Sequence, residues 1–146
     1  MMKNQATIKS GSSGSIVQII GPVIDVEFSK GNLPAIYNAL EIKSPGGDKL
    51  VLEVQQHLGE NVVRSVALGT TDGIKRGQDV KDTGAPISVP VGKETLGRIF
   101  NVFGQAIDNK GDVKAKKFYP IHIIAPGLEE QETTPEILET GIKVID

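Results

Sequence analysis

SIVQIIGPVIDVEF, residues 15–28, opens the ordered part of this chain and decides its fold. In its second half, apolar residues alternate with Asp25 and Glu27, which is the period of a half-buried β-strand. Gly21-Pro22 interrupts the run. Because proline cannot donate a hydrogen bond to a strand ladder, we expect a bend, a bulge or a break between two strands there.

More short apolar runs follow at close spacing. IYNALEIK (36–43) and LVLEVQQHL (50–58) flank the glycine-containing stretch SPGGDK (44–49), a pattern that predicts a hairpin. VVRSVALG (62–69) predicts a further strand after a short turn. The next stretch, residues 70–86, is rich in glycine and aspartate, so we expect mostly turns there.

Residues 15 to about 83 thus carry at least four or five short strands. Closure into a small barrel, or packing as a sandwich, would remove the exposed strand edges of so small a sheet. The polar residues 1–14 predict a flexible leader, and they lack the apolar core of a secretory signal. We place a boundary at residues 83–91, with the opening of an unfinished second domain after it.

The second part shows two helix signals and one strand signal. ISVPV (87–91) predicts a short edge-type strand, and GKET (92–95) could make a helical turn. Thr134 as N-cap, Pro135 at the first helical position and Gly141 beyond the last turn predict a helix of about two turns.

Composition excludes several classes of function. The chain has 146 residues, a formal net charge of −2 and no cysteine, so disulfides, thiolate nucleophiles and cysteine zinc sites are ruled out. The charge gives no reason to expect nucleic acid as a partner. Lys114, Lys116 and Lys117 form the one basic cluster, which we interpret as a solvated turn rather than a polyanion contact.

The stretch around GKET does not meet the requirements of a phosphate-binding loop, G-x-x-x-x-G-K-[ST]. With Gly92 and Lys93 as its last two fixed positions, the first glycine falls on Ile87. Glu94 replaces the hydroxyl residue that holds magnesium, and its carboxylate would face the phosphates. We therefore expect a structural turn.

The remaining candidates for chemistry have structural explanations. His57 and His122 lie in separate extended runs without a second ligand at metal spacing, so each is expected to be a structural or surface histidine. Asp25 and Glu27 could form a carboxylate pair, but on an alternating strand they are expected to face solvent or an interface. No nucleophile elbow of the G-x-S-x-G type is present. The residues predict no catalytic, cofactor-binding or metal site.

Four long blocks of the sequence carry a resemblance. The catalytic β subunit of F-type ATP synthases is closely resembled by residues 14–42, 50–77, 82–111 and 129–146. The sequence is most similar to those of the bacterial members. The block EVQQHLGENVVRSVAL points to the β rather than the non-catalytic α subunit. The similarity runs from about Gly14 to Asp146.

The resemblance implies a mainly β fold: a six-stranded N-terminal β-barrel over residues 15–83, then the start of an α/β nucleotide-binding domain over residues 84–146. In the family, such barrels join α subunits in an alternating hexameric ring, and the full-length β subunit also meets the central stalk. The ring belongs to the proton-translocating complex that makes ATP, on the cytoplasmic face of the bacterial membrane. The subunit touches the membrane only indirectly.

The resemblance also implies that this chain stops before the phosphate-binding loop. Mg-ATP and ADP would then be bound only by the full-length subunit, and this chain alone would be inactive. Ile123 and Leu128 stand where the family usually has an arginine and an aromatic residue. This puts in doubt any ion pair of this segment with the nucleotide domain. The alternatives are a stand-alone β-barrel interaction module, or a different rotary or export ATPase.

Overall fold

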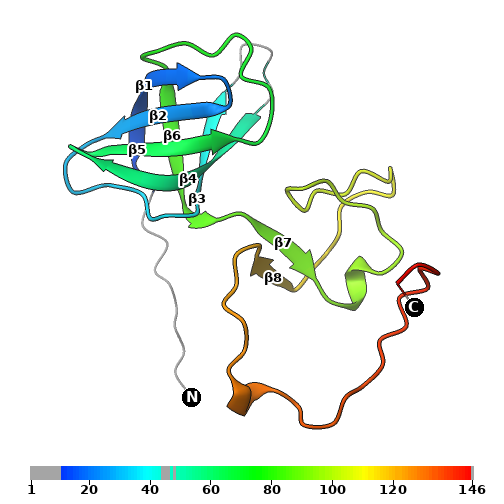
Figure 1. Cartoon of the computed structure of the whole chain (residues 1–146). Helices are drawn as coiled ribbons and strands as arrows, with labels where there is room; N and C mark the ends of the chain where they lie inside the picture. The colour runs from blue at the N-terminus through cyan, green and yellow to red at the C-terminus, as the bar shows by residue number, and fades with distance from the viewer. Residues whose placement is uncertain (1–10, 44–46, 48, 146) are drawn as a thin grey trace.

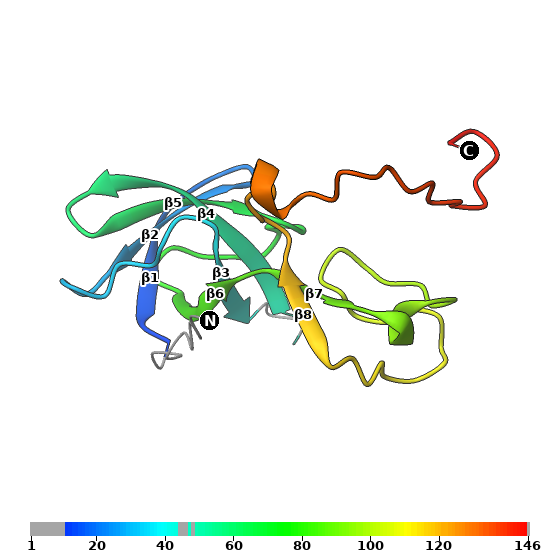
Figure 2. The same cartoon turned by 90° about the horizontal axis from the view of Figure 1, so that it is seen from below.

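A computed structural model describes residues 11–43, 47 and 49–145. The expected leader, apart from residues 11–14, lies outside the described residues, as does most of the turn at 44–49. Residues 13–86 form a closed barrel, and a two-stranded sheet with a long extended segment follows (Figures 1 and 2).

The barrel has six strands. They are β1 (Ser13–Ile20), β2 (Val23–Phe28), β3 (Asn38–Lys43), β4 (Lys49–Gly59), β5 (Val62–Ala67) and β6 (Asp79–Pro86). The strand order is β1-β2-β5-β4-β3-β6, every pair is antiparallel, and β6 returns to β1 through the pairing of Gly14 with Val80. The expected six-stranded barrel is confirmed.

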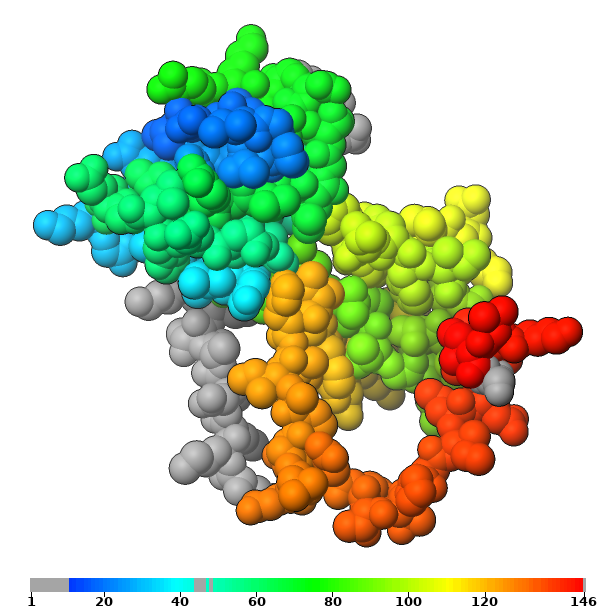
Figure 3. Space-filling model, viewed as in Figure 1, coloured from blue at the N-terminus to red at the C-terminus, as the bar shows by residue number. Residues whose placement is uncertain are grey.

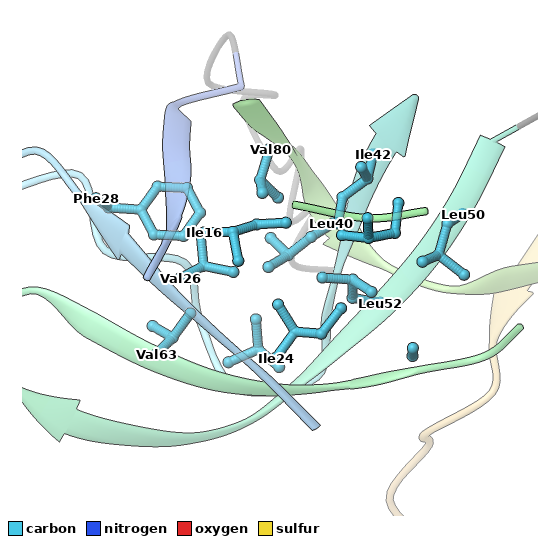
Figure 4. Packing of buried hydrophobic residues seen from close by; sticks show 13 residues of the cluster. Ile16, Ile24, Val26, Phe28, Leu40, Ile42, Leu50, Leu52, Val63 and Val80 are labelled. Atoms are coloured by element: carbon cyan, nitrogen blue, oxygen red, sulfur yellow. The ribbon is translucent and has the colours of Figure 1, made fainter. Parts of the chain in front are cut away.

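Closure of the barrel follows from the alternation seen in the sequence. In β5 every second residue is buried, and β2 buries the apolar residues that alternate with its acidic ones. The side chains that point inward meet at the barrel axis (Figure 4). Burying one such aliphatic side chain contributes about 1.5 to 3 kcal/mol, so this cluster is the main source of stability. Its fully buried members are Ile16, Ile24, Val26, Leu40, Ile42, Leu52, Val54, Val63 and Val80.

Gly21 and Pro22 form a two-residue connection between β1 and β2. Ile20 pairs with Val23 across it, and Gly21 has φ 58°, a value that glycine adopts without strain. Of the three possibilities predicted for this pair, the break between two strands is the one observed.

The expectation that residues 70–86 are mostly turns is wrong for their second half. β6 lies there between β1 and β3, and Val80 enters the core. Aspartate and glycine are poor strand formers, but pairing on both sides and burial outweigh that preference. β6 continues to Pro86, and its pairing with β3 shifts register next to Asn38.

Beyond the barrel the chain forms few regular elements. β7 (Ser88–Val91) pairs with β8 (Lys117–Pro120), which confirms the short strand expected at ISVPV. The turn expected at GKET is the 3-10 helix η1 (Lys93–Thr95), and a second one, η2, spans Leu128–Glu130. The described residues contain no α-helix, and none of their helices is long and apolar enough to cross a membrane.

The helix predicted from Thr134 to Gly141 is not formed. Thr134 lies in a bend and residues 135–140 have no regular secondary structure, and Ile137 and Leu138 are almost fully exposed. Helices this short are marginal in water without packing, and here no apolar surface covers them. Gly141 has the left-handed φ of 72° expected of a helix cap, but it lies in an irregular bend.

Candidate functional site

The candidate residues named from the sequence lie in four separate places, so the structure does not bring them together as one site. Asp25 and Glu27 are on β2 and His57 is on β4. Lys93 and Glu94 are on η1, and His122 follows β8. No group of three or more His, Cys, Asp or Glu side chains that could hold a metal ion occurs among residues 11–43, 47 and 49–145.

The pair Asp25 and Glu27 separates in the fold. Glu27 is exposed, as expected, but the Asp25 side chain is covered by Arg64 of the neighbouring strand β5. Both carboxylate oxygens of Asp25 accept hydrogen bonds from the guanidinium, at 2.8 Å each. These hydrogen bonds raise the pKa of Arg64. Of the two surroundings expected for Asp25, solvent or an interface, solvent is therefore wrong, because its side chain forms a structural ion pair within the barrel.

His57 has the structural role expected of it. Its Nε2 atom lies 2.7 Å from the carbonyl oxygen of Pro34 and so ties the loop between β2 and β3 to β4. That loop carries Leu33, Ile36 and Tyr37, which are partly exposed.

His122 makes a contact that the sequence did not predict. Its Nε2 lies 2.9 Å from a carboxylate oxygen of Glu53 on β4, and its ring stacks on Tyr37 with centroids 4.2 Å apart. Glu53 is buried, and its other oxygen accepts a 2.6 Å hydrogen bond from Gln55. Glu53 and Tyr37 were missed because nothing in the local pattern of β4 or its neighbouring loop indicates a partner so far along the chain.

The GKET segment is a turn. Thr95 donates from its hydroxyl to the Gly92 carbonyl at 2.7 Å, and Gly92 has φ 118°. Lys93 and Glu94 are exposed on η1, which is three residues long and has no N-terminal anion site. Lys114, Lys116 and Lys117 are likewise exposed. The turn expected of them is wrong for Lys117, which is the first residue of β8.

Residues 97–111, which we call the braced loop, are held by an ion pair that the sequence did not reveal. Arg98 donates to both oxygens of Asp108, at 2.6 and 2.9 Å, and also to the Gly111 carbonyl. Asp108 also accepts from the backbone N–H groups of Ile99 and Lys110. The hydrogen bonds from Arg98 hold the pKa of Asp108 well below its usual range.

A groove of about 790 Å³ lies between the barrel and the tip of the braced loop. Glu41 and Lys49, which form a 3.1 Å ion pair on β3 and β4, border one side, and Phe103 borders the other. The groove has no buried polar side chain without a partner among the described residues. It is a junction between two parts of the chain, with no arrangement of groups suited to catalysis.

The distribution of apolar side chains is the feature that separates the two halves of the chain. In the described residues every buried apolar side chain lies at or before Ile87. Most large apolar residues from Leu96 onward are exposed, although Phe100 and Phe103 are half-buried. The segment after β8 runs away from the barrel (Figure 3). The large apolar side chains of the second half are therefore mostly in contact with solvent.

Comparison with known proteins gives one family match. Residues 16–84 match the family model described as the ATP synthase alpha/beta family, beta-barrel domain. The matched residues coincide with the closed barrel of β1 to β6, and no residue of the C-terminal segment is included.

Proposed function

Because residues 16–84 are a β-barrel domain of the ATP synthase alpha/beta family, we propose that this chain is the N-terminal part of a β subunit of an F-type ATP synthase. The barrel joins α subunits in the alternating ring of the catalytic head, where the complete complex makes ATP from ADP and phosphate. The observation that carries the proposal is the agreement between the family match and a closed six-stranded barrel whose last strand ends at Pro86.

A closed barrel suits assembly into a ring. Its strands pair on both sides, so neighbouring subunits meet through side chains and not through free strand edges. Each barrel in an alternating ring contacts two neighbours through different faces, as a heterologous interface requires. Charged side chains on the outside of the barrel then set the choice of neighbour and the rate of association.

We assign residues 87–146, which follow the end of β6 at Pro86, to the start of the nucleotide-binding domain. The support is their exposed apolar side chains, which are suited to burial against further structure. The same feature speaks against a stand-alone interaction module, since such a module would bury these residues itself. The subunit is then peripheral, on the cytoplasmic face of a bacterial membrane, and it meets the central stalk and the proton-translocating part through the complex.

This chain alone supplies no catalytic group under the proposal. Mg-ATP and ADP are bound by the complete subunit, and GKET remains a turn without a nucleotide role. We therefore expect no ATP hydrolysis by the pure chain. Turnover that follows the chain through successive columns and is abolished in Lys93→Ala would identify GKET as a nucleotide site and overturn this part.

The assembly role is tested by mixing the full chain with purified α subunits of an F-type ATP synthase. Native mass spectrometry is expected to show mixed species with equal numbers of the two chains. Leu138→Ala, which changes an exposed residue outside the barrel, should assemble like the wild type. At about 10 μM of each chain, a complex with a binding free energy of about −8 kcal/mol is largely formed. If the α subunits and this chain stay separate at that concentration, the assembly role is wrong.

A further inference from the structure

We propose that residues 121–124 form a strap whose His122 is bound in a preformed imidazole pocket on the barrel, made by Tyr37 and Glu53. His122 is thus a positioning residue that fixes where the segment after β8 departs from the barrel surface. The inference rests on contacts within this chain and does not depend on the proposed function.

The two sides of the pocket recognise different properties of an imidazole. Tyr37 offers a flat aromatic surface, with the two rings inclined by 25°. Glu53 offers a carboxylate oxygen 2.9 Å from Nε2. A stacked ring and a hydrogen bond to a carboxylate together favour a planar side chain with a ring N–H, a description that histidine fits.

Burial of Glu53 makes the contact with His122 energetically important. Glu53 is 7% exposed, and Gln55 satisfies one of its two oxygens. His122 satisfies the other. The His122 side chain is itself 41% exposed. Removing the imidazole takes a donor from the Glu53 carboxylate, and a hydrogen bond to a charged group contributes more than one between neutral groups.

The barrel holds the pocket in shape independently of the strap. Tyr37 has φ 70°, which is unusual for a bulky residue and must be imposed by its surroundings. The Tyr37 N–H donates to the Val54 carbonyl at 2.8 Å, and the next residue, Asn38, donates to the Ala35 carbonyl. The ring of Tyr37 is therefore already placed when His122 arrives.

His122 is the point at which the C-terminal segment is attached to the barrel. On its N-terminal side, Ile121 donates from its N–H to the Ile87 carbonyl at 2.9 Å. On its other side, Ile123 is 68% exposed and Ile124 is 93% exposed. In Figure 3 the segment after β8 touches the barrel and then diverges from it. Release of His122 would thus free all that follows β8.

The test is amide hydrogen exchange of the full chain with His122→Ala, with Ile123→Ala as the matched control. The Ile121 amide reports strap opening, and the Leu52 amide reports the barrel. We expect His122→Ala to speed Ile121 exchange about tenfold, the effect of losing a hydrogen bond to a charged group, without changing Leu52. Ile123→Ala should leave both rates within about twofold, since exposed substitutions have small effects.

Two further measurements show whether the contact of His122 with Glu53 and Tyr37 protects the Ile121 amide from exchange. The double variant Glu53→Gln/His122→Ala should exchange at Ile121 no faster than His122→Ala, because the two residues act through one contact. In the wild type, a nuclear Overhauser effect is expected between the rings of Tyr37 and His122. An unchanged rate of Ile121 amide exchange in His122→Ala would overturn the proposal. If that variant fails to fold, the absence of the Tyr37–His122 nuclear Overhauser effect in the wild type would overturn it.

Discussion

The same substitution, leucine to alanine, is expected to lower the stability of the protein strongly in the barrel and hardly at all in the C-terminal segment. Leu52 on β4 is 0% exposed at the centre of the barrel, whereas Leu138 is 83% exposed in the C-terminal segment. Truncating a buried leucine costs about 2 to 5 kcal/mol, through lost transfer energy and the cavity that remains. A domain of this size has a total stability of roughly 4 to 11 kcal/mol, so Leu52→Ala removes a large part of it.

Thermal unfolding followed by far-ultraviolet circular dichroism measures the difference. Each 1 kcal/mol shifts the Tm of a domain this small by about 4 to 8 °C, so Leu52→Ala should lower the Tm by more than about 10 °C. Leu138→Ala should change it by less than about 4 °C, because exposed substitutions stay within about 0.5 kcal/mol. Equal losses in both variants at the same protein concentration would mean that residues after Ile87 pack a core in solution, and the division of the chain would be refuted.

Two more predictions follow from individual contacts. The pKa of Asp108 is lower in the folded protein than the value of about 4 expected in the unfolded chain. Its stabilising effect on the braced loop is therefore fully present above pH 4 and is lost only as the pH falls through the lower pKa of the folded state. The Ile99 amide resonance should therefore stay constant from about pH 6 to pH 3, and a midpoint near 4 would contradict the ion pair with Arg98. A Cβ at Gly14 would lie 2.7 Å from a backbone oxygen of the paired strand, so Gly14→Ala should cost about 1 to 3 kcal/mol. As the control, Gly127→Ala should leave the Tm unchanged in the same melting experiment, because a Cβ there would have no atom within 4 Å. Equal Tm values for the Gly14→Ala and Gly127→Ala variants would show that β1 is not paired as described.

Local pattern predicted most of the barrel. The alternation in β2 and the turn residues between apolar runs predicted at least four or five strands, because side-chain period and turn chemistry are local properties. β6 escaped this reasoning, since its aspartates and glycine resemble a loop until both neighbours are in place. The helix expected from Thr134 shows the opposite error: capping residues were present, but a packing surface was not.

Long-range polar contacts explain the remaining differences. Asp25 looked solvent-facing because its partner Arg64 is on another strand, and the period of a strand says only which face a residue occupies. His122 was correctly expected to be structural, yet its pocket on Glu53 could not be foreseen from spacing. The family resemblance gave the strand number and the barrel, which the family match and the structure confirm. The β-subunit assignment and its partners remain proposals.

The pairing of the first strand with the sixth also has a consequence for synthesis of the protein. Gly14 meets Val80, so the sheet cannot close until nearly the whole barrel sequence has left the ribosome. The hairpins β1–β2 and β4–β5 join neighbouring residues and can form earlier, whereas the closing pair bears the entropy of a long loop. During translation β1 therefore waits with one edge unpaired, and the nascent chain is most prone to misassociation in the interval before β6 emerges.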